Sequence, residues 1–166
     1  MTVSRQHSWK RDAGYAMLAL AVVVVVSVLG QIATYPNLTP WYASLSKPSF
    51  NPPNWVFGPV WTTLYLLMAF ALWRVLRLPP DTGGRKTALA YFFGQLALNA
   101  AWSWMFFRAH SPLLGLVDIV PQLVLIAAAV VTFARVDRIA AWCLVPLLAW
   151  VSYASLLNIA VWRLNG

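Results

Sequence analysis

Five long apolar stretches constrain this chain more than any other feature of its sequence. A membrane-spanning helix needs about 20 mainly apolar residues, and runs of that length lie at 13–34, 55–77, 87–108, 112–134 and 139–162. Only 10% of the residues are charged, whereas soluble domains average about 25%. We therefore predict an all-α integral membrane protein, a bundle of five transmembrane helices that contacts membrane lipid.

The connectors between these runs are short, except for residues 35–54. Helices joined by short connectors lie antiparallel to their neighbours, so we expect one five-helix transmembrane domain over residues 13–166. A basic N-terminal tail, residues 1–12, precedes it. The basic start and first apolar run resemble a signal peptide, but the run is long and no A-x-A cleavage site follows it, so we interpret it as a retained helix.

Lysine and arginine are distributed unequally between the two sides of the predicted bundle. They lie at the ends of the apolar runs, not in a basic stripe, so the net charge of +8 indicates membrane topology and no nucleic-acid partner. In a bacterial inner membrane this asymmetry places the N-terminus in the cytoplasm; an outer membrane, where the rule does not apply, stays possible. The side of the N-terminus carries Arg5, Lys10, Arg11, Arg74, Arg77, Arg85, Lys86, Arg135 and Arg138. The opposite side carries only Lys47, Arg108 and Arg163.

The long first connector is rich in proline and aromatic residues. Proline fixes φ and lowers the entropy of the unfolded loop, so this connector can be rigid. A rigid aromatic loop beside a helical bundle favours a lid over a cavity. The alternative is an interfacial belt of Trp and Tyr, but a belt does not require the six prolines Pro36, Pro40, Pro48, Pro52, Pro53 and Pro59.

Three of the predicted helices carry an aromatic face. Residues three or four positions apart share a helix face, and such a stripe is more often packed core than a ligand site. Three such faces with hydrogen-bonding atoms nevertheless indicate a cavity whose flat walls suit a planar tetrapyrrole. These faces comprise Trp61, Tyr65, Met68 and Leu72; Gln95, Asn99, Trp102 and Phe106; and Trp150, Tyr153, Ala154 and Leu157.

Small residues occupy the opposite face of the third helix, at Ala90, Gly94, Ala97 and Ala101. Small side chains at this spacing let a second helix approach closely. That second helix can belong to the same bundle or to a second protomer, so a homodimer seam and internal packing both stay open.

Asp118 is an acidic residue within an apolar run, and Gln122 follows one turn later on the same face. Charged residues inside membrane spans are costly and are usually functional. Asp118 can be a proton or cation site, a pocket residue or a structural hydrogen-bond partner; without a second acidic residue for an acid/base pair, we favour the structural role.

The first connector and the start of the second helix resemble a known family. The pattern W-Y-x-x-L-x-K-P-x-F-N-P-P-x-W-V-F-G-P-V-W-T-x-L-Y, which begins at Trp41, is similar to the signature of the translocator-protein (tryptophan-rich sensory protein, TspO/MBR) family. The resemblance continues through Asn99-Ala100-Ala101-Trp102-Ser103, Asp118, Pro146, Trp150, Leu157-Asn158 and Trp162-Arg163.

This resemblance implies a fold, a ligand and a site. Members of that family are five-helix bundles, commonly homodimers, which bind porphyrins such as protoporphyrin IX and in some cases sterols or synthetic aromatic ligands. It implies protoporphyrin IX or haem as a ligand, with no required cofactor. The matching ligand-pocket positions are Trp41, Tyr42, Pro52, Phe57, Trp61, Tyr65, Asn99, Trp102, Phe106, Trp150 and Ala154.

The family's C-terminal sterol motif is broken in this chain. The motif requires a Leu or Val, then a Tyr, then a Lys or Arg at short spacings, whereas Ile159 and Ala160 stand where its aromatic residues belong. We therefore do not expect cholesterol as a ligand.

Three functions follow from these patterns. The leading one is porphyrin binding for sensing, regulation or transport of tetrapyrroles. The second is an enzyme that degrades protoporphyrin oxidatively or photochemically, in which the resemblance assigns redox roles to Trp61 and Trp150. The chain has no nucleophile–base pair, His–carboxylate cluster or metal-ligand spacing, which favours a protein that is not an enzyme and has no metal site. The third is an ion-coupled small-molecule transporter that uses Asp118, although no internal repeat supports it.

Overall fold

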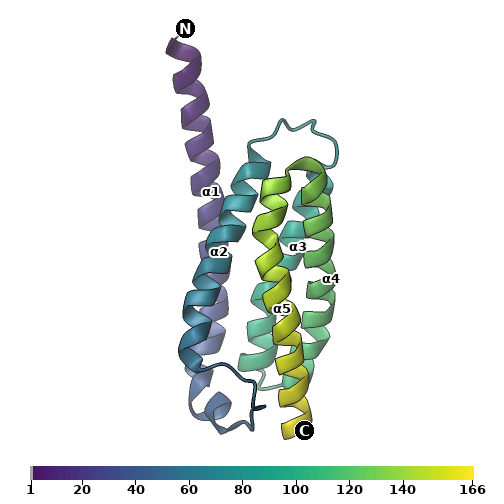
Figure 1. The fold of residues 1–166 in the computed structure, drawn as a ribbon. Helices are drawn as coiled ribbons and strands as arrows, with labels where there is room; N and C mark the ends of the chain where they lie inside the picture. Colours follow the sequence, from purple (N-terminus) through teal and green to yellow (C-terminus); the bar gives the residue numbers. More distant parts are fainter. Residues whose placement is uncertain (1) are drawn as a thin grey trace.

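The computed structural model describes residues 2–166, with side chains from Trp9 onward, and forms an antiparallel helical bundle (Figure 1). Within that part of the chain there are no strands. This confirms the predicted all-α five-helix fold. Its helices are α1 (Thr2–Thr34), α2 (Asn54–Leu76), α3 (Arg85–Ser103), α4 (Pro112–Val136) and α5 (Arg138–Asn165).

Two boundaries differ from those expected. Helix α1 begins at Thr2, so the predicted tail 1–12 is helical from its second residue and projects beyond the bundle (Figure 1). No proline or glycine precedes Gly14, so nothing in the sequence stops the helix earlier. The run predicted at 87–108 divides into α3 and a wider turn, η3 (Trp104–Arg108). The side chains of Arg5 and His7 lie outside the described ones.

Local signals explain where the later helices begin. Ser111 accepts a hydrogen bond from the Leu114 N–H at 3.2 Å, with Pro112 at the first helical position of α4. Backbone N–H groups in the first turn of a helix have no helical partner. Ser111 satisfies one of them with its side chain, and Pro112 removes another because it has no N–H. Asp137 caps α5 in the same way, accepting from the Ala140 N–H at 3.0 Å.

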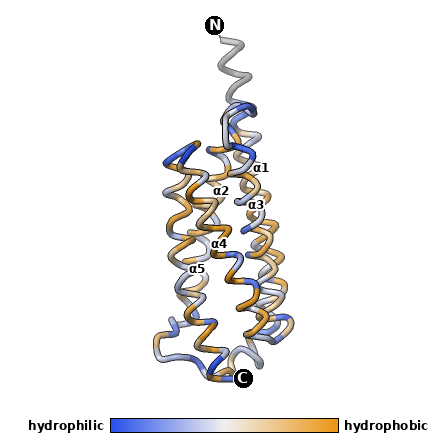
Figure 2. The backbone as a smooth tube through the Cα atoms, turned by 90° about the vertical axis from the view of Figure 1, so that its right-hand side faces the viewer, coloured by the Kyte–Doolittle hydropathy of each residue, from blue (hydrophilic) through white to orange (hydrophobic). Residues whose placement is uncertain are grey.

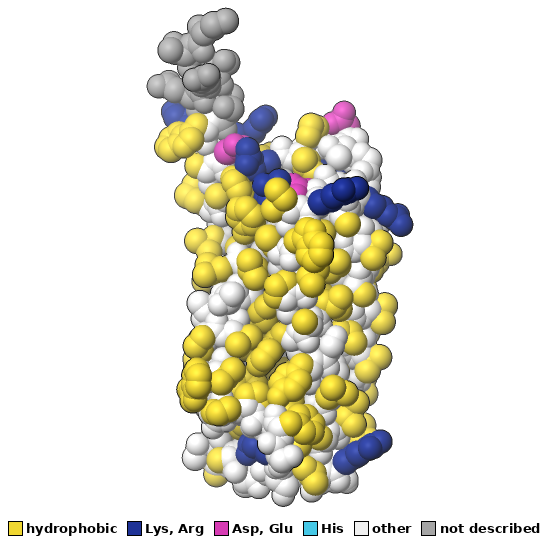
Figure 3. Space-filling view, viewed as in Figure 1, with side chains coloured by type: hydrophobic (Ala, Val, Ile, Leu, Met, Phe, Trp, Pro, Cys, Tyr) yellow, Lys and Arg dark blue, Asp and Glu magenta, His cyan; other side chains and the backbone are white. Residues whose placement is uncertain are grey.

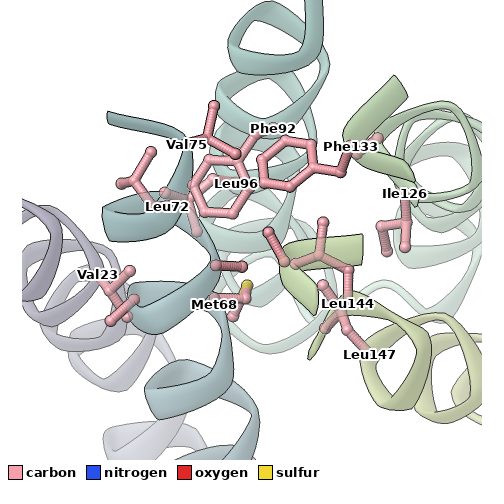
Figure 4. Close-up of a cluster of buried hydrophobic side chains, with 14 of the residues drawn as sticks. Val23, Met68, Leu72, Val75, Phe92, Leu96, Ile126, Phe133, Leu144 and Leu147 are labelled. Atoms are coloured by element: carbon pink, nitrogen blue, oxygen red, sulfur yellow. The ribbon is translucent and has the colours of Figure 1, made fainter. Parts of the chain in front are cut away.

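The helices form a closed ring in the order α1, α2, α5, α4, α3. The packed core fills the half of this ring nearest the loop between α2 and α3, where Phe92 and Phe133 stack at 5.7 Å (Figure 4). Arg85 closes that end, because its guanidinium donates to the carbonyls of Val75 and Leu76 at the end of α2. The other half of the ring remains available for a cavity.

The outer surface of the bundle is that of a membrane protein. Apolar side chains cover its length, and Lys and Arg gather at its two ends (Figure 3), while hydrophobic residues follow one another along the helices (Figure 2). In the described part of the chain, four helices are long and apolar enough to cross a membrane: those containing Trp9–Tyr42, Asn54–Leu76, Pro112–Val136 and Arg138–Asn165. Helix α3 is more polar because it carries Gln95 and Asn99, which it buries inside the bundle.

Candidate functional site

A cavity of about 830 Å³ occupies the half of the ring opposite the packed core. All five helices contribute to its wall, and residues of the first loop, now bounded as 35–53, cover its end. Small-molecule sites typically measure about 300–1,000 Å³. The cavity is therefore large enough for a drug-sized or larger planar ligand.

Nine of the eleven pocket positions that the sequence suggested lie in this wall. They come from the first loop and from α2, α3, η3 and α5, so residues far apart in the sequence meet around one space. Their ligand contacts stay a prediction. The nine are Tyr42, Phe57, Trp61, Tyr65, Asn99, Trp102, Phe106, Trp150 and Ala154.

Trp41 and Pro52 do not line the cavity. The Trp41 indole lies behind the wall, edge-on to Phe106 at 5.5 Å, and stacks on the His110 ring at 4.7 Å. Pro52 lies in the loop, where its carbonyl accepts from the Asn51 side chain at 2.9 Å. Both residues support residues that do line the cavity.

Flat aromatic rings make up much of the wall. Trp102 and Phe106 stack almost parallel, 4.8 Å apart with an angle of 17° between their planes. Phe57 meets Trp150 edge-on at 5.8 Å across the α2–α5 side. Such rings present both faces and edges to a guest, which is the geometry that aromatic stacking requires.

Two hydrogen-bonded links fix the polar groups of the wall. The Tyr65 hydroxyl donates to Asn99 Oδ1 at 2.8 Å and joins α2 to α3. Asn158 accepts from the Trp102 indole N–H at 3.1 Å and donates to the Pro112 carbonyl at 2.7 Å, which joins α3, α4 and α5. These links hold the aromatic side chains of the wall in position.

Asp118 lies on α4 beside this site but is not part of the cavity wall. Its side chain is buried, at 3% exposure, and both carboxylate oxygens lack a hydrogen-bond partner among the described residues. Gln122, one turn along, does line the cavity, and its Nε2 is also buried without a partner. The expected structural hydrogen bond of Asp118 is therefore not seen.

The first loop is held against the bundle by contacts with the end of α5. The Asn165 amide accepts from the Ser46 N–H at 2.8 Å and donates to the Ser46 carbonyl at 2.9 Å. The Tyr153 hydroxyl donates to the Phe50 carbonyl at 2.6 Å. In this arrangement the loop covers the end of the cavity; whether it opens as a lid stays a prediction.

Sequence reasoning missed the contribution of α1. Its continuous valine run shows no aromatic face, yet Ser27, Gln31 and Thr34 all line the cavity. Their spacing of four and three residues is itself a helical polar stripe, which was the available signal. Asn158 was noticed only through the family resemblance, because a single amide in an apolar run has no pattern of its own.

The wall of the cavity combines aromatic and aliphatic side chains with uncharged polar ones. Among the described residues that line the cavity, none is acidic, basic or a histidine. A charge enclosed there without a partner would be costly. The cavity therefore suits the flat apolar body of a ligand, and any ionised group of that ligand must lie at an opening.

Comparison with known proteins agrees with this architecture. The model of the TspO/MBR family matches residues 18–163. The chain is 42% identical over 152 residues to the tryptophan-rich protein TspO of Chlorobaculum tepidum, covering 89% of this chain and 94% of that protein. It is 37% identical over 150 residues to the tryptophan-rich protein TspO of Archaeoglobus fulgidus, covering 89% and 95%. It is 43% identical over 126 residues to the human translocator protein, covering 75% of each.

Proposed function

The chain belongs to the TspO/MBR family, and we propose that it binds porphyrins, such as protoporphyrin IX, for the sensing, regulation or transport of tetrapyrroles. The observation that carries the proposal is the cavity of about 830 Å³, walled by aromatic rings and free of charged residues among those described. A porphyrin is a flat apolar ring system with acidic substituents on one edge. Its ring body matches that wall.

The polar atoms of the wall support a planar ligand of this kind. Asn99 Oδ1 accepts a hydrogen bond from the Tyr65 hydroxyl, and Asn99 lines the cavity. Trp150 of α5 lines another side of the cavity. A porphyrin between them gains stacking on the aromatic rings and a hydrogen-bonding group at its rim.

The test is the quenching of tryptophan fluorescence by protoporphyrin IX in purified protein. We expect Asn99→Ala and Trp150→Phe each to raise the Kd by about tenfold, which is the loss of about 1.4 kcal/mol. Trp142→Phe is the matched control, because Trp142 is exposed on α5 and does not line the cavity. Quenching that does not saturate contradicts porphyrin binding at this site. A rise of the Kd in Trp142→Phe equal to that in the two cavity variants contradicts it as well.

Degradation of the porphyrin is a second candidate, favoured by the position of Trp61 and Trp150 in the same cavity wall. Illumination of the complex distinguishes it from binding alone. If porphyrin absorbance disappears with a defined product, and Trp61→Phe with Trp150→Phe stops that loss, the protein is an enzyme. A complex whose absorbance persists under light supports binding for sensing, regulation or transport.

Ion-coupled transport through Asp118 is a third candidate, favoured by its two unpartnered carboxylate oxygens. Proton-dependent porphyrin uptake into vesicles that Asp118→Asn abolishes, without loss of binding, is the result this function requires. Uptake that does not change with the proton gradient excludes it.

A further inference from the structure

The wall of the cavity is incomplete between α1 and α2. Leu20 and Val24 of α1 line the cavity, and each is also 48% exposed. Leu66 of α2 also lines the cavity and is 58% exposed. Residues that face both the cavity and the surroundings mark a side opening, and its edges lie within the apolar part of the two helices.

The α2 edge of this opening is lined by small and polar residues. Gly58 and Thr62 lie one turn apart, both line the cavity and both are exposed. A Cβ added at Gly58 would meet no atom within 4 Å. The space beside Gly58 is therefore open, not filled by a neighbouring helix.

The α1 edge carries a polar pair in an otherwise apolar helix. Gln31 Nε2 donates to Ser27 Oγ at 2.9 Å, and both residues line the cavity. Polar side chains in a membrane span are costly and usually face a cavity or a polar pathway. Gln31 lies three residues before the end of α1 at Thr34, which is about 5 Å at 1.5 Å per residue. Gln31 is therefore close to the end of α1, and Ser27 lies one turn further inside.

The two helices are joined at the opposite end of the bundle. Asp12 of α1 accepts from the Trp73 indole through its carbonyl at 3.2 Å and pairs with Arg77 through its carboxylate at 3.1 Å. The opening is thus restricted to the cavity half of the α1–α2 seam. The first loop, by contrast, is tied to α5 through Ser46 and Phe50.

The ionised groups of the ligand give this opening a role. The cavity wall has no cation among its described residues, and Lys47 of the first loop already donates to the carbonyls of Tyr42 and Leu45 at 2.7 and 3.1 Å. A carboxylate enclosed in the cavity would lose its hydration without compensation. At the Ser27–Gln31 edge it lies at the opening, toward the end of α1, and within reach of an amide donor.

We propose that flat amphipathic acids enter the cavity from the bilayer through the side opening between α1 and α2, and that Gln31 and Ser27 hydrogen-bond their carboxylates there. This inference rests on the proposed porphyrin function and adds a route and a specificity-determining pair. The aromatic ring system passes between Gly58 and the α1 edge without leaving the apolar phase. The loop over the cavity end stays in place during entry.

The route is tested by rates of binding in liposomes whose bilayer contains protoporphyrin IX, followed by stopped-flow tryptophan quenching. Gly58→Leu adds bulk at the opening, where a Cβ would meet no atom within 4 Å, so association and dissociation should both slow by about tenfold. Gly14→Leu is the matched control, because Gly14 is also a helical glycine with open space and lies outside the cavity wall. Thr62→Leu adds bulk one turn along and repeats the test at a second position.

The loop provides the competing route and its own variant. Asn165→Ala removes both hydrogen bonds that hold Ser46. Our route predicts unchanged rates in Asn165→Ala. Faster binding in Asn165→Ala, together with normal rates in Gly58→Leu and Thr62→Leu, overturns the side opening but leaves porphyrin binding intact. A lipid chain that permanently fills the opening would also leave rates normal in the two α2 variants, and that result equally overturns the proposal.

The specificity pair is tested with two forms of the ligand. Gln31→Leu should raise the Kd for protoporphyrin IX by about tenfold. It should leave the Kd for the dimethyl ester, which lacks ionised carboxylates, unchanged. Equal effects on both ligands would contradict a carboxylate contact at Gln31. If no variant and no wild-type sample shows saturable quenching by either ligand, the porphyrin function itself is wrong.

Discussion

At Gly115 the backbone of α4 lies too close to its neighbours to carry a side chain. A Cβ there would lie 2.7 Å from Asn158 Oδ1 and 2.9 Å from Phe106 Cδ2. Asn158 is the residue that links Trp102 to α4, and Phe106 is part of the aromatic wall. The absence of a side chain at residue 115 is therefore a condition for the shape of the cavity.

Gly115→Ala should destabilise the protein by about 1–3 kcal/mol, the usual cost of overpacking, and weaken porphyrin binding. The added methyl group must displace the Asn158 amide, which breaks its hydrogen bond to Trp102. Thermal unfolding in detergent and the porphyrin titration measure the two effects. Gly14→Ala is the control, because its added Cβ meets no atom within 4 Å. Equal stability of the two variants would contradict this account of Gly115.

Most of the pocket positions suggested from the sequence do line the cavity, because helical spacing and the family resemblance agreed on them. Trp61, Asn99 and Trp150 belong to regular helices, where residue number determines the face. Trp41 was misplaced because it lies in η2 (Leu38–Tyr42), which contains an extended residue at Thr39 (φ −134°, ψ 131°). No period predicts the direction of a side chain in such a segment.

At the scale of elements, the junction of α4 and α5 depends on Asp137. Its carboxylate accepts from Ala140 N–H at 3.0 Å and from Arg74 Nε at 2.9 Å. Burial raises the pKa of Asp137, but the hydrogen bonds from Arg74 and the α5 backbone, with the charge of Arg74, lower it below its ordinary value of 3.8. The residue therefore caps α5 and joins it to α2.

The pKa of Asp137 is lower in the folded state than in the unfolded one. Its contribution to the free energy of unfolding is therefore fully present above the ordinary carboxyl pKa and is lost as the pH falls through the lowered value. Asp137→Ala should cost about 1–2 kcal/mol at pH 7, with the difference from wild type narrowing below about pH 4. Helical circular dichroism during thermal unfolding across this pH range measures it. Asp81→Ala, in the exposed loop after α2, is the control; a deficit in Asp137→Ala that does not change with pH contradicts the mechanism.

The number and type of elements followed from apolar run length, whereas their ends did not. The continuation of α1 through the basic residues 2–12 was missed because charged residues suggested a tail, although they are good helix formers. Helix α3 was expected to cross the membrane on the basis of its run alone. Its buried Gln95 and Asn99 show that its polar face points into the bundle.

At the scale of the whole molecule, the charge distribution supports one orientation, and we propose an inner-membrane protein with a cytoplasmic N-terminus. In a Cys143→Ala background, Ser49→Cys in the first loop should react with a membrane-impermeant maleimide in spheroplasts. Asp81→Cys, in the loop between α2 and α3, should react only after lysis. Both positions are exposed in the structure, so access depends on the side of the membrane, and the reverse pattern would contradict the proposal.

We also propose that α3 pairs with a second copy of the chain. Ala90 and Ala97 are exposed on its outer face, whereas the Cβ position of Gly94 lies 3.2 Å from Leu125 Cδ1 of α4 within the same bundle. The stripe of small residues thus packs partly inside the bundle and leaves small residues on the outside. A second helix can approach closely there.

Ala97→Phe should shift the protein from dimer to monomer, because the large ring holds a second α3 away. The mass of the protein in detergent, from light scattering corrected for bound detergent, measures this. Val124→Phe is the control, since Val124 is an exposed apolar residue of α4. A monomeric wild-type protein, or dissociation by both variants alike, contradicts an α3 seam.

The bundle could be predicted from the sequence at this scale, but the side opening could not. Its existence depends on how far α1 and α2 lie apart along half of their seam, and the valine run of α1 shows no difference between a lipid-facing and a cavity-facing residue. The polar residues Ser27, Gln31 and Thr34 interrupt that uniformity. Whether these polar residues face a cavity or a packed neighbour depends on the position of α2, which the sequence of α1 does not determine.

If a porphyrin binds in the uncharged aromatic cavity, each chain should bind one porphyrin, and the stoichiometry of binding can be measured. Purified wild-type protein at a concentration well above the Kd is titrated with protoporphyrin IX, with a detergent-only blank containing free tryptophan analogue. Binding in the cavity predicts quenching that rises linearly and stops sharply at one porphyrin per chain, while the blank shows no break. Quenching that rises without a break and matches the blank would contradict it.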